Sequence, residues 1–186
     1  MEKHLFEADE LQALLTELGD RIAKRGERVD AYIIGGTAMA IGLGSRRGTE
    51  DVDGLFRPYK VVEEESAKMA AELGLRSDWL NTRAFSFMSV PSEDTDAKEI
   101  KFSGMTVRLA SPKFLLAMKM AAGRLKDHGD VAILIRHLEL TNPEQIVNIT
   151  FGIFGDDGMT LTDTRESVVL QAREMLRLAW GESESS

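Results

Sequence analysis

Apolar residues in the first 110 positions alternate between a helical and a strand-like spacing. In segment 6–26, leucine and isoleucine recur every three or four positions, which predicts a helix with one apolar face. Short apolar runs bounded by glycine or polar residues predict strands, and the stretches between them predict further helices. The expected strands span 30–34, 51–56, 84–90, 98–102 and 106–109, and the further helices span 37–44 and 59–73.

The pattern after residue 110 is helical throughout. Ser111 before Pro112 is a strong helix start, because serine caps the first turn and proline suits its first position. The expected helices span 112–137, 143–154 and 164–180, with Asn142 and Asp163 as further caps. The sequence therefore predicts an α+β protein, with a small mixed β-sheet and helices in 1–110 and a helical C-terminal part, 111–186, packed on that core.

Composition and charge narrow the classes of function. The chain of 186 residues has no cysteine, which leaves out disulfides, thiol nucleophiles and zinc–thiolate sites. Its net charge of −8 argues against a general nucleic-acid coat, which is usually basic, although a local RNA contact stays open. No apolar run approaches the ~20 residues that cross a bilayer, and the first residues do not resemble a signal peptide. We expect a cytoplasmic protein with no membrane partner.

Two glycines stand between the first predicted strand and the helix that follows it. Gly35 and Gly36 would let the backbone approach a phosphate group closely, and a helix N-terminus favours negative charge. Thr37 adds a hydroxyl group at the same point. The alternative is an ordinary tight turn, of which a glycine pair taken alone is the more typical sign.

Asp51 and Asp53 are two positions apart on the next predicted strand, so their side chains should share one face. Adjacent carboxylates repel each other unless a cation lies between them. Mg²⁺ prefers carboxylate and phosphate oxygens, and the pair therefore suits a nucleotide-phosphate site. The alternative is that one aspartate caps a turn and the other is solvated.

A lysine–aspartate pattern lies within the predicted helix 112–137. At about 100° per residue, Lys119, Lys126 and Asp130 fall within an arc of roughly 40° that borders the apolar stripe. Such an arc suits the lining of a cleft. Asp127 lies further round, so Asp130 is favoured and Asp127 is second. The alternative is a solvated face with local ion pairs.

Together these motifs resemble a known superfamily. Gly-Gly-Thr at 35–37 followed by Asp-x-Asp at 51–53 is similar to the signature of the nucleotidyltransferases related to DNA polymerase beta. The stretch 32–53 resembles more narrowly the AbiEii-type toxins of bacterial type IV toxin–antitoxin systems. Lysine at 119 and Arg-x-Lys-Asp-x-x-Asp at 124–130 resemble the third motif of that family, and the resemblance covers most of 30–138.

The resemblance implies a role for each motif. The Gly-Gly-Thr residues would hold the triphosphate of an NTP, and Asp51 and Asp53 would bind Mg²⁺. Lys119 would meet the triphosphate, and Asp130 or Asp127 would complete the active site. The connecting-loop residues assigned to the nucleotide by the same resemblance are Arg46, Arg47 and Thr49.

Two further segments bear on the site. Many relatives of this kind carry a third carboxylate on a later strand, for which Glu99 and Asp96 are both candidates. The segment Asp-Trp-Leu-Asn at 78–81 is similar to one that often precedes the later strands in this family. We expect it to form a capped turn with a buried tryptophan.

The expected activity is transfer of a nucleoside monophosphate from an NTP to an acceptor, with release of pyrophosphate. By resemblance the acceptor is the 3′ end of tRNA, which would make the protein a translation-blocking toxin with a cognate antitoxin. Two alternatives stay open. One is an enzyme that modifies a small hydroxylated antibiotic, whose positive charge would suit this acidic chain. The other is a non-catalytic module that binds a nucleotide or a partner.

Overall fold

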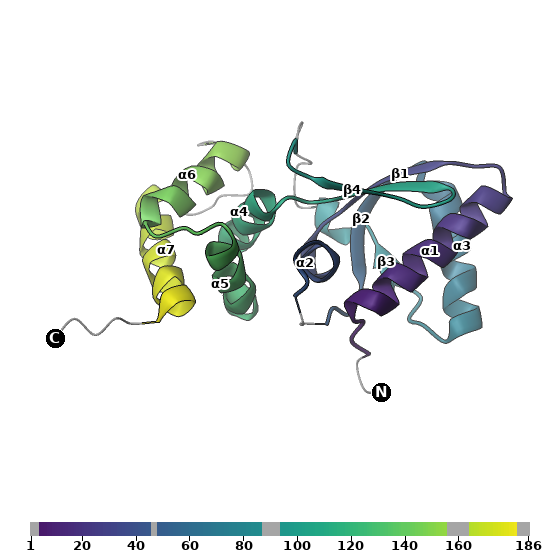
Figure 1. The fold of residues 1–186 in the computed structure, drawn as a ribbon, viewed down its shortest axis with the longest axis horizontal. Coiled ribbons are helices and arrows are strands. Elements are labelled where there is room, and N and C mark those ends of the chain that lie inside the picture. Colours follow the sequence, from purple (N-terminus) through teal and green to yellow (C-terminus); the bar gives the residue numbers. More distant parts are fainter. Residues whose placement is uncertain (1–3, 46–47, 87–93, 156–163, 182–186) are drawn as a thin grey trace. The chain divides into compact units, whose positions relative to one another are not determined.

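The computed structural model describes residues 4–45, 48–86, 94–155 and 164–181. In this part of the chain it has the α+β architecture expected from the sequence, with a mixed sheet and many helices (Figure 1). The chain divides into two compact units: the described residues up to Ala110, except Asp94, form the first, and Asp94 with the described residues from Ser111 onward forms the second. Asp94 belongs to the second unit and accepts a hydrogen bond from the Ser111 backbone N–H at 2.8 Å.

The first unit is a five-stranded sheet with helices. The strand order is β3-β2-β1-β5-β4. β1 runs antiparallel to β2 and parallel to β5, β2 is parallel to β3, and β4 is antiparallel to β5, so the expected mixed sheet is confirmed. The elements are α1 (Ala8–Lys24), β1 (Val29–Ile33), α2 (Gly35–Leu43), β2 (Val52–Arg57), α3 (Tyr59–Leu73), β3 (Leu80–Asn81), the 3-10 helix η1 (Arg83–Ser86), β4 (Lys98–Lys101) and β5 (Met105–Leu109).

The two faces of this sheet differ because side chains alternate along each strand. On one face, apolar residues are buried where α1, α2 and α3 pack against the strands. The other face carries polar residues such as Asp30 and Arg108, and Tyr32 is buried there beside Phe85 of η1. The buried apolar residues of the covered face are Val29, Ala31, Ile33, Val52, Phe56, Met105, Val107 and Leu109.

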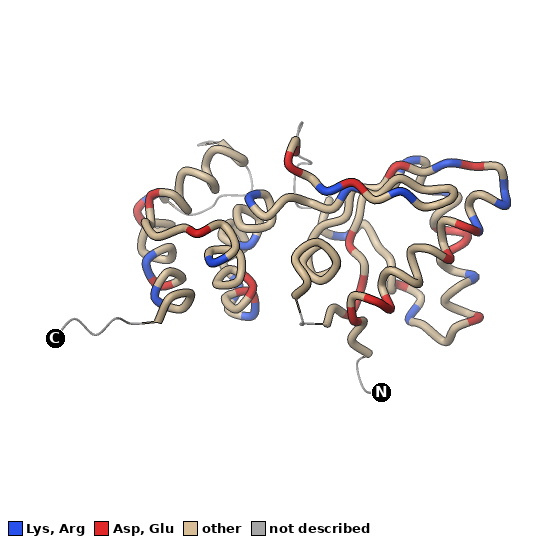
Figure 2. The backbone as a smooth tube through the Cα atoms, in the orientation of Figure 1, with Lys and Arg blue, Asp and Glu red and all other residues tan. Residues whose placement is uncertain are grey.

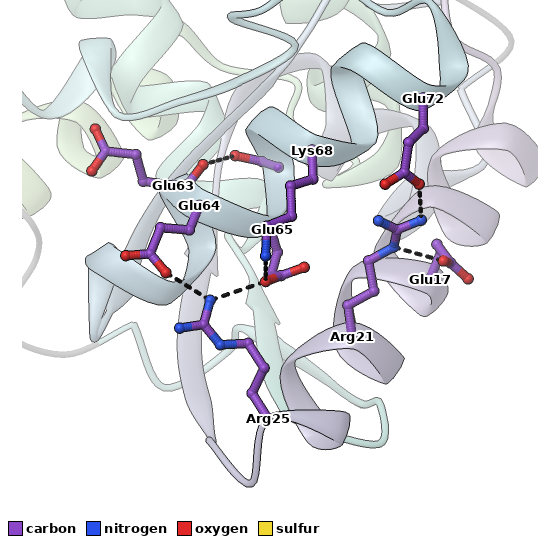
Figure 3. A network of polar contacts seen from close by, with 9 residues as sticks. Glu17, Arg21, Arg25, Glu63, Glu64, Glu65, Lys68 and Glu72 are labelled. Carbon is purple, nitrogen blue, oxygen red and sulfur yellow. Dashed lines mark hydrogen bonds and ion pairs between the residues drawn. The ribbon is translucent and has the colours of Figure 1, made fainter.

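Ion pairs join α1 to α3 (Figure 3). Glu65 of α3 is the most enclosed member, since 7% of its side chain is exposed, and it accepts from Lys68 at 2.7 Å and from Arg25 at 2.9 Å. Hydrogen bonds from Lys68 and then from Arg25 lower the pKa of Glu65. The pairs that cross between the helices are Arg21–Glu72, Arg25–Glu64 and Arg25–Glu65.

The second unit is helical. Its elements are α4 (Pro112–Ala122), the 3-10 helix η2 (Leu125–Asp127), α5 (His128–His137), α6 (Pro143–Phe154) and α7 (Arg165–Trp180). α4 packs on α5 and α6, and α7 packs on α5 and α6. Two bonds tie the end of α7 to this bundle: Trp180 Nε1 donates to the Leu140 carbonyl at 2.8 Å, and Arg136 donates to the Ala179 carbonyl at 2.9 Å.

The expected single helix over 112–137 is wrong. Gly123 ends α4 in the left-handed conformation, with φ +56°, and its N–H bonds back to the Lys119 carbonyl at 3.2 Å. Glycine adopts this conformation without steric cost, which makes it a common helix terminator. The chain then forms η2 before the helix resumes as α5.

The other expected elements differ in detail. The caps at Ser111 and Asn142 are confirmed, since each side chain accepts a backbone N–H of the first turn. α7 is capped by Thr164, and Asp163 lies outside the described residues. The expected strand 84–90 is wrong over 84–86, which belong to η1, and 87–90 lie outside the described residues. β3 was not expected.

Charged residues of both signs are interspersed along the two units (Figure 2). No helix among the described residues combines the length and apolarity needed to cross a bilayer.

Candidate functional site

Asp53 is the second residue of β2 and Asp51 immediately precedes that strand, and both are partly exposed. The residues between and after them, Val52, Gly54 and Phe56, are buried on the helix-covered face. Asp53 lies opposite Asn81 in the parallel pairing of β2 with β3, and Asn81 Nδ2 donates to Asp51 Oδ2 at 3.1 Å, so the two carboxylates lie on the same side of the sheet.

The glycine turn directly adjoins this pair. α2 begins at Gly35, whose φ of +65° favours glycine, and a Cβ at this residue would lie 3.7 Å from Asp53 Oδ2. The Ile34 N–H donates to the Asp53 carbonyl at 3.0 Å. Ile34 is the N-cap of α2, and no side chain caps this helix. The N-terminus of α2 and the two carboxylates therefore form one compact arrangement.

Two hydroxyl groups hold the backbone of Asp51. Thr37 is fully buried, and its Oγ1 donates to the Asp51 carbonyl at 3.0 Å. Thr49 Oγ1 donates to the same carbonyl at 3.1 Å. The resemblance assigned both threonines to the nucleotide. In the structure their hydroxyl groups hold Asp51 in place.

Gly36 makes the approach of Thr49 possible. A Cβ at residue 36 would lie 2.5 Å from Thr49 Oγ1 and 2.7 Å from Thr49 Cβ, distances that real Cβ atoms essentially never show. Thr49 is held from the other side by a β-bridge to Phe6, with N–O distances of 2.8 and 3.1 Å. The absence of a side chain at Gly36 therefore allows the loop before β2 to pack on α2.

Asn81 of β3 is a site residue that the sequence analysis missed. Its Nδ2 donates to Asp51 Oδ2 at 3.1 Å, and only 7% of the residue is exposed. The parallel pairing of β3 with β2 sets Asn81 opposite Asp53. The only sequence signal was the segment 78–81, whose expected buried tryptophan is confirmed by Trp79, which is fully buried.

The loop that leads to Asn81 is fixed by an ion cluster around Asp78. Arg76 donates to both carboxylate oxygens of Asp78, at 2.9 and 2.8 Å, and Arg83 binds the same carboxylate. These bonds, from Arg76 first and Arg83 second, lower the pKa of Asp78. Trp79 Nε1 donates to the Ser66 carbonyl of α3 at 3.1 Å, which anchors the loop to that helix.

The carboxylate pair fits Mg²⁺ in its donor chemistry. Mg²⁺ is usually held by one or two protein carboxylates together with substrate phosphates and water, so two aspartates on one side of a strand are sufficient. Among the described residues, no three or more His, Cys, Asp or Glu side chains gather as a metal cage. A closed zinc-type site is therefore not formed in this part of the chain.

Neither candidate for a third carboxylate joins the pair. Glu99 of β4 lies opposite Arg108 of β5, and β5 and β1 both stand between β4 and β2. Three strand spacings of about 4.8 Å separate β4 from β2 by roughly 14 Å. Asp96 is exposed and precedes β4, and it forms no group of three with Asp51 and Asp53.

In the second unit, Lys119 binds two aspartates. Its Nζ lies 2.8 Å from Asp127 Oδ1 and 2.8 Å from Asp130 Oδ2. The lysine side chain is 6% exposed and the aspartates are 15% and 16% exposed. Because α4 ends at Gly123, the chain turns there and brings η2 and the start of α5 back toward α4, so both aspartates reach the lysine. The expected arc is therefore wrong in its geometry, and Lys126 is exposed.

Arg46 and Arg47, which the resemblance assigned to the nucleotide, lie outside the described residues. No protein-family model, curated protein or solved structure matches this chain.

Proposed function

We propose that this chain is a Mg²⁺-dependent nucleotidyltransferase that moves a nucleoside monophosphate from an NTP to an acceptor hydroxyl and releases pyrophosphate. The observation that carries the proposal is the position of Asp51 and Asp53 on one side of β2, beside the glycine start of α2. This arrangement combines groups that attract a cation with a helix N-terminus that attracts an anion.

Each part of the site has a role in this reaction. Asp51 and Asp53 would hold Mg²⁺, which supplies charge neutralisation at the phosphates and lowers the pKa of an attacking hydroxyl. Gly35 and Gly36 begin a helix whose N-cap residue, Ile34, offers no polar side chain to the first-turn N–H groups. Those N–H groups favour a phosphate oxygen. The protein would act mainly by positioning these charges.

Lys119 is proposed to offset charge on the leaving pyrophosphate. An ammonium group has three N–H donors, and Asp127 and Asp130 accept from two of them. The two aspartates would fix the direction of the third donor.

We further propose, from the sequence resemblance, that the acceptor is the 3′ end of tRNA. The protein would then act in the cytoplasm as a toxin that a cognate antitoxin restrains. The net charge of −8 favours a second candidate, a cationic small molecule such as an aminoglycoside, because an acidic surface attracts positive charge. Both candidates use the same chemistry at Asp51 and Asp53.

The test is incubation of the purified chain with each α-³²P-labelled NTP, Mg²⁺ and total tRNA. Asp53→Asn keeps the shape of the side chain and removes its charge, so we expect it to lose the activity by at least about 100-fold. Asp30→Asn is the matched control, because Asp30 is an exposed aspartate on the neighbouring strand β1. Label on RNA with wild type and Asp30→Asn, but not with Asp53→Asn, would support a tRNA-modifying enzyme.

Other outcomes separate the alternatives. Label that appears only on an added aminoglycoside would favour the small-molecule enzyme and contradict the tRNA proposal. NTP binding without pyrophosphate release, with every acceptor class tested, would contradict the transferase and favour a non-catalytic nucleotide-binding module.

A further inference from the structure

The orientation of the Asn81 side-chain amide is determined by its neighbours. Its Oδ1 accepts a hydrogen bond from the Arg83 backbone N–H at 3.0 Å. A backbone N–H can only donate, so this atom of Asn81 must be the carbonyl oxygen and the other must be the NH₂ group. The NH₂ group therefore faces the Asp51 carboxylate, and Nδ2 donates to Asp51 Oδ2 at 3.1 Å.

This bond affects the two oxygens of Asp51 differently. Within the described part of the chain, Asn81 is the side chain that donates to the Asp51 carboxylate, and it donates to Oδ2. The backbone carbonyl of the same residue is held by Thr37 and Thr49. The backbone carbonyl and Oδ2 of Asp51 are therefore held by hydrogen bonds, and within the described part of the chain Oδ1 is the oxygen left for a further ligand.

We infer that Asn81 is a positioning residue for the cation site: it holds Oδ2 of Asp51 and presents Oδ1 to the metal ion. The inference rests on the proposed function, because it assumes that Asp51 and Asp53 bind a cation. Hydrogen bonds to a ligating carboxylate from residues behind it are a general means of orienting metal ligands, and their loss typically costs about 10–100-fold in metal affinity. Asn81 also reduces the repulsion between the two carboxylates by donating to one of them.

The surroundings of Asn81 suit a positioning role. The residue is 7% exposed, and it belongs to a strand pair that lies alongside both aspartates. The ion cluster at Asp78 and the buried Trp79 immobilise the chain just before it. A donor held this firmly restricts the rotation of the Asp51 carboxylate before any cation binds.

Asn81 also closes a turn, and the experiment must separate this structural role from the positioning role. The bond from the Arg83 N–H to Asn81 Oδ1 spans two residues, as in an Asx turn. Serine at residue 81 can accept the same N–H through its hydroxyl group, because Ser forms equivalent turns, but it is too short to reach Asp51. Alanine can do neither.

The probe is Mn²⁺ alone, titrated into the full chain while free Mn²⁺ is followed by electron paramagnetic resonance. The variants are Asn81→Ser, Asn81→Ala and Asp53→Asn, and the matched control is Asp30→Asn, at an exposed aspartate of the neighbouring strand β1. We expect Asp53→Asn to abolish site binding and Asn81→Ser and Asn81→Ala both to raise the Kd by about 10-fold or more. Asp30→Asn should leave the Kd essentially unchanged. Thermal unfolding of each variant reports the turn separately, and Asn81→Ser should lose less stability than Asn81→Ala.

Three results would contradict the inference, in distinguishable ways. Wild-type Mn²⁺ affinity in both Asn81→Ser and Asn81→Ala, with Asp53→Asn inactive in binding, would overturn the positioning role and leave the metal site intact. Recovery of the Kd by Asn81→Ser relative to Asn81→Ala would show that only the turn matters. Wild-type protein that binds Mn²⁺ no better than Asp53→Asn would refute the proposed cation site, and the role of Asn81 would fall with it.

Discussion

Replacing Gly36 with alanine would place a methyl group where Thr49 already lies. The new Cβ would be 2.5 Å from Thr49 Oγ1 and 2.7 Å from Thr49 Cβ. Unstrained contacts between carbon atoms are about 3.5–4.0 Å, so Thr49 or the start of α2 must move by about 1 Å. Thr49 is held by Phe6 on one side and bonds to the Asp51 carbonyl, so the movement would reach the carboxylate pair.

The expected cost is the difference between two effects. Overpacking of this kind costs about 1–3 kcal/mol. Alanine is favoured over glycine in a helix by about 0.5–1 kcal/mol, which offsets part of it. A contact as short as 2.5 Å belongs in the upper half of the overpacking range, about 2–3 kcal/mol, so Gly36→Ala should destabilise the first unit by about 1–2.5 kcal/mol. Gly42, in the same helix, provides the control, because a Cβ there would meet only Leu109 Cδ1 at 3.7 Å. Gly42→Ala should stabilise the unit by up to about 1 kcal/mol.

Urea unfolding followed by tryptophan fluorescence measures both variants. The chain has two tryptophans, and in a Trp180→Phe background only Trp79 of the first unit reports. The substitution Thr49→Gly removes both of the atoms that clash, so Gly36→Ala should cost little when it is added to Thr49→Gly. If Gly36→Ala is as stable as wild type, or if it costs as much in the Thr49→Gly background as in wild type, the close contact does not determine the choice of glycine.

Two further predictions concern the ion clusters. Lys119→Met should destabilise the second unit by about 3 kcal/mol, because two partly buried aspartates lose their cation, and neutralising both aspartates as well should recover most of this loss. Urea unfolding, followed by Trp180 fluorescence in a Trp79→Phe background, measures the free energy of unfolding of each variant. Equal costs for the single and the triple variant would refute the prediction. Because hydrogen bonds from Lys68 and then Arg25 lower the pKa of Glu65 below its ordinary 4.5, the charged carboxylate stabilises the fold above that pH and the contribution disappears as pH falls through the lowered pKa. The difference in melting temperature between wild type and Arg25→Ala should therefore be largest near pH 7 and small near pH 3, and a difference that persists at pH 3 would contradict this account.

The parts of the fold that could be predicted from sequence are those set by neighbours along the chain. Ser111 with Pro112 marks the start of α4, and Gly74 in the left-handed conformation ends α3 as a glycine at that position suggests. The alternation of apolar and polar residues did not predict β3, because a strand of two residues is too short to show that alternation. The helix break at Gly123 was missed, although glycine is a common helix terminator, because the residues beyond it continue the helical composition.

The candidate site was predictable to a similar degree. The carboxylates of Asp51 and Asp53 were expected on one side of the sheet, because residues two positions apart in extended backbone point the same way. The bond from Asn81 to Asp51 joins residues that are 30 positions apart, so no local sequence pattern could predict it. The double pairing of Lys119 likewise depends on the fold of the chain after Gly123, which places Asp127 as close to the ammonium group as Asp130.

The position of β1 in the sheet has a consequence for synthesis of the chain on the ribosome. β1 is the central strand, and its second edge is filled only by β5, with Val29 opposite Met105. While the intervening segments are being translated, the nascent chain holds an apolar strand whose backbone N–H and C=O groups on one edge have no native partner. Such an edge is prone to pair with other chains. Rapid emergence of β5 shortens this exposure, and a stall in translation before residue 105 would favour aggregation over folding.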